Sequence, residues 1–137
     1  MRQFGVELYD RWTALWNGDT GLAAEIMAPE FRLRYAQAGT EAFDDIRHPA
    51  QLSAAIAGWH RQRPGLRFTA EGPAVVDIAM PDGAAPQGSV ARPYLASFLN
   101  ESGQTVSRSG TDILTFIGGR ITEVWSVSSG AGGRTFS

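Results

Sequence analysis

The 137-residue chain contains no cysteine and no lysine. Without cysteine it can form neither a disulfide nor a thiolate nucleophile, and a cysteine-based metal site is excluded. Its twelve basic residues are all arginine and its acidic residues number fourteen, so the net charge at pH 7 is −2. That charge gives no electrostatic case for a nucleic acid or an anionic membrane as a partner.

Long hydrophobic runs are also missing. No apolar stretch approaches the roughly 18 residues that a membrane helix needs. Residues 1–12 include acidic side chains and lack the apolar core of a secretory signal, so we expect a cytoplasmic protein. The length fits one domain, which we place at residues 1–129, followed by a flexible C-terminal tail at 130–137.

The N-terminal half of the chain predicts three helices. Apolar and aromatic side chains recur there at i, i+4 and i+7, the spacing of one buried helix face. Pro29 is expected to end the second helix, and Pro49 suits the first turn of the third. The expected helices cover residues 3–16, 20–28 and 49–62.

The remaining segments predict strands. Alternation over residues 31–35 places Phe31, Leu33 and Tyr35 on the inward face of a strand, and the loop 36–47 is long enough to form a cavity rim. Helices early and antiparallel strands late predict an α+β fold, with the helices on one face of a curved sheet. The later strands are expected at 66–71, 74–80, 89–100, 104–117 and 120–128.

The last two strands form the most distinctive stretch. Gly118-Gly119 separates two β-rich runs and predicts a tight hairpin turn, which needs positive φ. On the first of these strands, Asp112 shares a face with Leu114 and Phe116. Burial among apolar neighbours raises the pKa of a carboxyl, so Asp112 is a candidate proton donor or acceptor near neutral pH.

Three segments together resemble the NTF2-like superfamily, and within it the SnoaL-like polyketide cyclases and the ketosteroid isomerases. They are LWNGDTGLAAEIMAPEFRLRY, RQRPGLRF and SGTDILTFIGGRITEVW. The resemblance implies a cone in which a bent sheet and three helices enclose a deep apolar pocket. It also implies a homodimer packed through the outer sheet face, which would cover an apolar patch that a monomer exposes. We expect that face to carry Ile113, Ile117, Ile121, Trp125 and Val127.

The resemblance also assigns roles to single positions. Asp112 matches the catalytic acid/base of SnoaL-like cyclases and the protonated oxyanion-hole aspartate of ketosteroid isomerases. The general-base aspartate of the isomerases falls on Tyr35 here, and their oxyanion-hole tyrosine falls near Arg11. A steroid isomerase is therefore not expected, and Tyr35 becomes a candidate donor to a substrate oxygen.

We expect Asp112 and Tyr35 to be catalytic, and the aromatic residues to shape the pocket or to belong to the plain core. Arg108 shares a strand face with Asp112, and either neutralises that carboxylate or lies at the rim. His48 and His60 have no carboxylate partner and no ligand spacing, so no metal site is predicted. The residues expected to contact substrate are Trp12, Trp16, Trp59, Phe116, Arg108 and His48.

These observations lead to the hypothesis of a cofactor-independent enzyme for acid–base chemistry. The reaction would be a cyclisation, isomerisation or dehydration of a small apolar metabolite that carries a carbonyl group. Two alternatives stay open. One is a non-catalytic, ligand-binding NTF2-like dimer. The other is a limonene-type epoxide hydrolase, which would need a second carboxylate beside Asp112.

Overall fold

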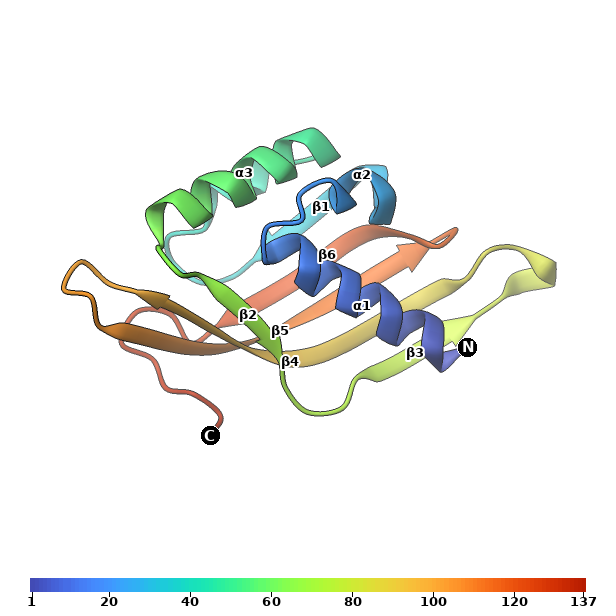
Figure 1. Cartoon of the computed structure of the whole chain (residues 1–137). Helices are drawn as coiled ribbons and strands as arrows, with labels where there is room; N and C mark the ends of the chain where they lie inside the picture. The colour runs from blue at the N-terminus through green and yellow to red at the C-terminus, as the bar shows by residue number, and fades with distance from the viewer.

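The computed structural model describes residues 1–137 and places the helices over one side of a single sheet (Figure 1). This confirms the predicted α+β class. The helices are α1 (Arg2–Trp16), α2 (Leu22–Ile26) and α3 (Pro49–Gln62), with short 3₁₀ helices η1 (Glu41–Asp45) and η2 (Pro81–Gly83). The strands are β1 (Met27–Tyr35), β2 (Arg67–Ala70), β3 (Val75–Ala79), β4 (Gln87–Leu99), β5 (Thr105–Ile117) and β6 (Arg120–Ser128).

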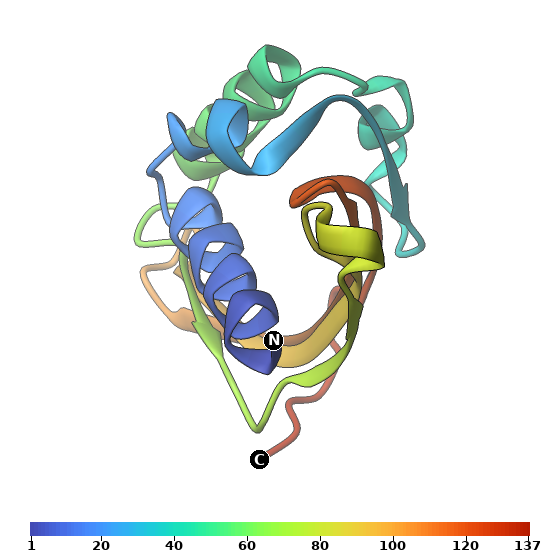
Figure 2. The ribbon, with the colours of Figure 1, turned by 90° about the vertical axis from the view of Figure 1, so that its right-hand side faces the viewer.

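The sheet is mixed but mainly antiparallel. Its order is β1-β6-β5-β4-β2, and β3 also pairs with β4. Only β1 and β6 run parallel. The predicted interruption at Gly72-Pro73 separates β2 from β3, which occupy successive parts of the same edge of β4. Seen from one end, the sheet curls round and the helices close the open side (Figure 2).

Two polar joints fix the end of α1 to its neighbours. The Asn17 side chain donates from Nδ2 to the Phe68 carbonyl over 2.9 Å, and its Oδ1 accepts from the Phe68 amide over 2.7 Å. On the other side, His60 Nε2 lies 2.6 Å from the Trp16 carbonyl oxygen, which ties α3 to α1. Trp16 is thereby held between a helix and the sheet.

The boundary between the second helix and the first strand differs from the prediction. The helix ends at Ile26 rather than near residue 28, and Pro29 lies inside β1. Proline is tolerated there because β1 is an edge strand that pairs only with β6. Arg120 Nη1 also donates to the Ala24 carbonyl over 2.9 Å and to the Met27 carbonyl over 3.2 Å, which satisfies carbonyl groups at this junction.

The predicted position of Ile121 on the outer sheet face is wrong, because this side chain is fully buried. The cause is a register shift in the β5–β6 pair, where Thr115 pairs with Glu123 but Phe116 pairs with Ile121. A bulge of this kind inserts one extra residue into a strand and turns the following side chains to the other face. The other outward residues are exposed as expected: Ile113, Ile117, Trp125 and Val127.

The C-terminal residues form no helix or strand beyond Ser128. The Phe136 amide nevertheless donates to Ser109 Oγ over 2.8 Å, so this segment contacts the start of β5. The mobility of residues 130–137 and the domain boundary at 129 stay predictions. No helix in the structure combines the length and the apolar character that crossing a bilayer requires.

Candidate functional site

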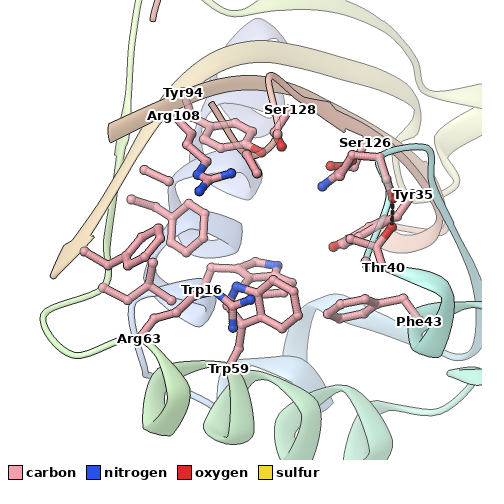
Figure 3. A pocket seen from close by; sticks show the side chains of 18 of the residues that line it. Trp16, Tyr35, Thr40, Phe43, Trp59, Arg63, Tyr94, Arg108, Ser126 and Ser128 are labelled. Carbon is pink, nitrogen blue, oxygen red and sulfur yellow. Dashed lines mark hydrogen bonds between the residues drawn. The ribbon is translucent and has the colours of Figure 1, made fainter. Parts of the chain in front are cut away.

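A cavity of about 510 Å³ opens between the helices and the inner face of the sheet. Its 21 lining residues come from α1, α3 and the turn after it, η1 and the loop before it, strands β1, β2, β4, β5 and β6, and the segment after β6. Figure 3 shows side chains from the sheet facing side chains from the helices across this space. The volume suits a small organic molecule.

Aromatic rings form the helix side of the cavity. Tyr35 stacks on Phe43 with ring centroids 4.7 Å apart, and Phe43 meets Trp59 edge-on at 5.4 Å. Trp16 lies 5.9 Å from Phe43. Phe43 belongs to the loop 36–47, which was predicted as a cavity rim and does line the cavity. The rings form an apolar wall that suits an aromatic ligand.

Asp112 lies in the opposite wall, on β5, and its residue surface is only 8% exposed. Trp12 Nε1 donates to Oδ2 over 2.9 Å, whereas Oδ1 is buried and has no hydrogen-bond partner in the protein. Burial raises the pKa of Asp112 above the usual value for aspartate. Ser126, its neighbour on β6, and Trp12 favour the ionised form and offset only part of this rise. The Ser126 hydroxyl lowers the pKa of Asp112, although it forms no hydrogen bond to Oδ1.

Two tyrosines lie on the cavity wall near this carboxyl. Burial raises the pKa of both Tyr35 and Tyr94, and the charge of Asp112 raises each further. Their hydroxyl groups therefore stay protonated at physiological pH and act as hydrogen-bond donors. Tyr94 lies across Gly110, its partner on β5, where any side chain carbon would overlap the phenol. Glycine at 110 is thus required for the position of Tyr94.

Arg108 does not neutralise Asp112. The molecule contains three ion pairs, and neither Arg108 nor Asp112 takes part in any of them. The two residues share a strand face but are four positions apart, which is about 13 Å along a strand. Arg108 instead lies at the cavity wall, with its Cζ 5.6 Å from the Phe98 ring centroid. Arg108 thus lines the cavity without pairing with Asp112, and a solvent-facing position at the rim stays a prediction.

The structure brings five of the expected site residues together around the cavity. They are Trp16, Tyr35, Trp59, Arg108 and Asp112.

The other three expected contacts do not line the cavity. Trp12 is buried behind Asp112 and reaches the site only through its hydrogen bond to that carboxyl. Phe116 is core, with its ring 5.4 Å from that of Phe4. His48 begins α3, and its Nδ1 lies 3.0 Å from the Pro29 carbonyl oxygen. Their positions give no support for direct substrate contact.

Several lining residues were not expected from the sequence. Arg63 follows α3 by one position, and its spacing of four from Trp59 was a signal that both lie on one helix face. Tyr94 and Ser126 carry no such local signal, because the strand registers place them beside Asp112. Thr40 lies on the rim, where its hydroxyl donates to a backbone carbonyl over 2.6 Å.

Unpartnered polar atoms concentrate at this cavity. Five buried side-chain nitrogen or oxygen atoms have no hydrogen-bond partner in the protein, and four of them belong to residues that line the cavity. Buried polar atoms in folded proteins are nearly always satisfied. The protein itself therefore leaves several polar groups around this cavity without a hydrogen bond. The four atoms are Trp16 Nε1, Gln37 Oε1, Arg108 Nε and Asp112 Oδ1.

Asp112 is the one acidic residue that lines the cavity. An epoxide hydrolase of the limonene type would need a second carboxylate there, so the geometry does not favour that alternative. Nowhere in the molecule do three histidine, aspartate or glutamate side chains form a group that could hold a metal ion.

Comparison with known proteins bears on the family and the fold. The family model for the SnoaL-like domain matches residues 7–124. No curated protein matches the chain. Among solved structures, a candidate polyketide cyclase from Acidithiobacillus ferrooxidans has a TM-score of 0.72 at 16% identity, covering 95% of this chain and 91% of its own.

Two further solved structures are similar. A candidate SnoaL-like polyketide cyclase from Jannaschia sp. CCS1 has a TM-score of 0.64 at 18% identity, with 92% of this chain and 85% of the other covered. A candidate isomerase from Bacillus subtilis has a TM-score of 0.63 at 15% identity, with 92% and 86% covered. At such identities the likeness establishes a shared fold.

Proposed function

Because the chain belongs to the SnoaL-like domain family, we propose that it is an enzyme that moves a proton on a small apolar metabolite carrying a carbonyl group. The reaction class is a cyclisation, an isomerisation or a dehydration, with side chains of the protein as acid and base. The observation that carries the proposal is the buried Asp112 carboxyl in the wall of a cavity that aromatic rings line on one side, with one oxygen bonded to Trp12 and the other unpartnered.

Trp12 determines which oxygen of Asp112 handles the proton. An indole N–H can only donate, so Oδ2 accepts this hydrogen bond whether the carboxyl is ionised or neutral. The proton of the neutral acid therefore resides on Oδ1. Burial raises the pKa of Asp112, which makes its carboxylate a stronger base than an exposed aspartate.

The tyrosine hydroxyls supply the complementary role. In the proposed step, Oδ1 takes a proton from the carbon next to the substrate carbonyl, and the electron pair of that C–H bond moves toward the carbonyl oxygen. Tyr35 or Tyr94 donates a hydrogen bond to the oxygen as negative charge develops on it. In an isomerisation, Asp112 then returns the proton to a different carbon. In a cyclisation, the carbanion attacks a second carbonyl carbon of the substrate, the electron pair of that C=O bond moves to its oxygen, and Asp112 returns the proton there. In a dehydration, the electron pair forms a C=C bond as a neighbouring hydroxyl leaves, and the proton from Asp112 makes the leaving group water.

Binding without catalysis is the second candidate function, since the aromatic wall would suit it equally well. A purely binding function gives no role to Asp112, a buried carboxyl that lacks a cationic partner. Burying such a group lowers the stability of the fold. The open cavity and the absence of an Asp112–Arg108 pair therefore favour catalysis.

We also propose that the protein is a homodimer through the outer face of β5 and β6. The outer face patch is formed by Ile113, Ile117, Trp125 and Val127, each at least 40% exposed. Contiguous apolar surface of this kind is usually covered by a partner. The cavity opens on the other face of the same strands, so such a dimer would leave it accessible. The cytoplasmic location stays a prediction from the sequence.

The test of the catalytic proposal is an activity screen against carbonyl-bearing metabolites, with Asp112→Asn and Asp77→Asn compared with the natural protein. Asp77 is an exposed aspartate on β3 and serves as the matched control. We expect Asp112→Asn to lose at least about 100-fold in turnover, the typical contribution of a general acid or base. Asp77→Asn should be unaffected, and equal turnover by Asp112→Asn would overturn the assignment.

A further inference from the structure

Two arginines without an acidic partner face the same cavity. Arg63 follows α3, Arg108 lies on β5, and both line the space. Figure 3 shows Arg108 reaching in from the sheet and Arg63 lying on the helix side. The three ion pairs of the molecule involve other arginines. Neither guanidinium is therefore explained by a bond to a carboxylate of the protein.

Both guanidinium groups lie over aromatic rings. Arg63 Cζ lies 3.5 Å from the Trp59 ring centroid, and Arg108 Cζ lies 5.6 Å from that of Phe98. A guanidinium donates its hydrogen bonds in its own plane, so contacts to its face leave the donors free. Arg108 Nε is buried with no acceptor in the protein. Arg63 makes a single side-chain hydrogen bond, a long one of 3.5 Å from Nη1 to Gln62 Oε1.

The charge balance of the cavity is positive. Asp112 is its only acidic residue, against the two arginines. The two arginines are close enough to repel each other. The pKa of Arg63 is lowered first by burial and then by the charge of Arg108. Two like charges held at one cavity wall are stabilised when an anion binds with them.

We propose that Arg63 and Arg108 form a subsite for an anionic group, a carboxylate or a phosphate, carried by a ligand whose apolar body lies along the aromatic wall. Planar oxygen acids match the in-plane donors of a guanidinium and can accept two bonds from each. The α-carbons of Arg108 and Asp112 lie about 13 Å apart along β5, from strand geometry. The ligand would therefore carry its acidic group on a different part of the molecule from its reacting carbonyl.

This inference rests on the cavity being the ligand site of the proposed function, but it does not require catalysis by Asp112. Binding probes therefore test it without turnover. The probes are 2-naphthoate, its neutral amide 2-naphthamide, and 2-naphthyl phosphate, each titrated calorimetrically. Naphthoate and the amide share one ring system and differ in charge. Comparison of naphthoate with naphthyl phosphate decides whether a carboxylate or a phosphate is the better occupant.

We expect at least one anionic probe to bind about tenfold or more tightly than the amide, because charge-assisted hydrogen bonds are the stronger ones. Arg63→Gln and Arg108→Gln should each remove most of this preference, because they weaken binding of the anion much more than binding of the amide. Arg67→Gln is the matched control, since Arg67 is exposed on β2 and does not line the cavity. Its affinities should equal those of the natural protein.

Equal affinity for anion and amide, or no binding of either anion at millimolar concentration, would overturn the inference. So would an anion preference that survives in Arg63→Gln, Arg108→Gln and the double variant. Asp112→Asn separates the two proposals. If Asp112→Asn loses turnover but keeps the preference for the anion, both proposals hold. The arginine variants test only the subsite, because they report on binding and not on proton transfer.

Discussion

Asp112 is a carboxyl that the fold buries without neutralising. Trp12 satisfies one oxygen, and nothing in the protein bonds the other. No arginine forms an ion pair with it. The ionised form is consequently disfavoured, and burial raises the pKa of the group. Such an arrangement reduces stability at neutral pH, which is understandable where the carboxyl performs proton transfer.

The first prediction concerns stability and pH. Since folding raises the pKa of Asp112, the folded protein binds this proton more tightly than the unfolded chain does. The free energy of unfolding should therefore fall as pH rises from about 4, the value in the unfolded chain, through the folded pKa. Asp112→Asn removes this term, so its melting temperature should exceed that of the natural protein at pH 8 or so, with the gap closing toward acid.

Thermal unfolding across this pH range measures the difference, with Asp77→Asn as the control that should show no such divergence. If the natural protein and Asp112→Asn lose stability in parallel as pH rises, the carboxyl is not strained by burial.

The second prediction concerns the Trp12 indole. Trp12→Phe keeps an aromatic ring but removes the only hydrogen bond to Oδ2. The ionised form of Asp112 should then be less favoured, and its titration midpoint should move to higher pH. Trp125→Phe is a matched control, because the Trp125 indole bonds Glu123 on the exposed outer face. A midpoint that stays in place, or moves equally in both variants, would refute the role given to Trp12.

Among the secondary-structure elements, the joint between α1 and β2 positions the aromatic wall. Asn17, the residue after Trp16, forms hydrogen bonds with both the amide and the carbonyl of Phe68. Asn17→Ala leaves that amide and that carbonyl without their partners, and we expect a loss of about 2 kcal/mol in the free energy of unfolding. Urea denaturation measures it, with Glu7→Ala on the exposed face of α1 as a control that should change by less than about 0.5 kcal/mol. A similar loss in both variants would mean that the joint adds nothing.

The elements also differ in how far the sequence alone predicts them. The helices predicted at 3–16 and 49–62 follow from local periodicity, and the bounds of α1 and α3 agree with the prediction to within a residue. The α2–β1 boundary was missed because it depends on tertiary structure. Pro29 can lie in β1 because β1 is an edge strand, and Arg120 bonds the Ala24 carbonyl near the end of α2. The face of Ile121 was missed because a bulge opposite Thr115 and Phe116 changes the register, and a two-residue turn does not reveal a bulge.

The candidate site divides in the same way. Asp112 and Tyr35 could be placed on inward faces from alternation within single strands. Tyr94 could not be linked to Asp112 from the sequence, because its position depends on pairing with Gly110 across β4 and β5. The resemblance to the SnoaL-like branch is confirmed by the family match, which spans most of the residues that carried it.

At the level of the whole molecule, one face of the sheet lines the cavity, and the proposed dimer uses the other. Ile117 and Val127 in the outer face patch are 61% and 52% exposed. We expect the natural protein to be dimeric by light scattering after size-exclusion chromatography, and the Ile117→Glu/Val127→Glu variant to be monomeric, since like charges would face each other across the interface.

Ala50→Glu is the control for this experiment. Ala50 is exposed on α3, which covers the opposite side of the sheet, so its replacement should leave the dimer intact. A natural protein that is monomeric at micromolar concentration, or a dimer that survives both glutamates, would contradict the assignment of this face.

The central claim is that Asp112 is a proton-transfer group tuned by burial, and its titration tests that claim most directly. The carboxyl carbon of Asp112 can be followed by ¹³C NMR in labelled protein, with its signal identified by its absence from Asp112→Asn. The account predicts a midpoint clearly above the usual aspartate value of about 4. A midpoint at or below that value would mean that the carboxyl is ionised and satisfied in the fold, and the claim would be wrong.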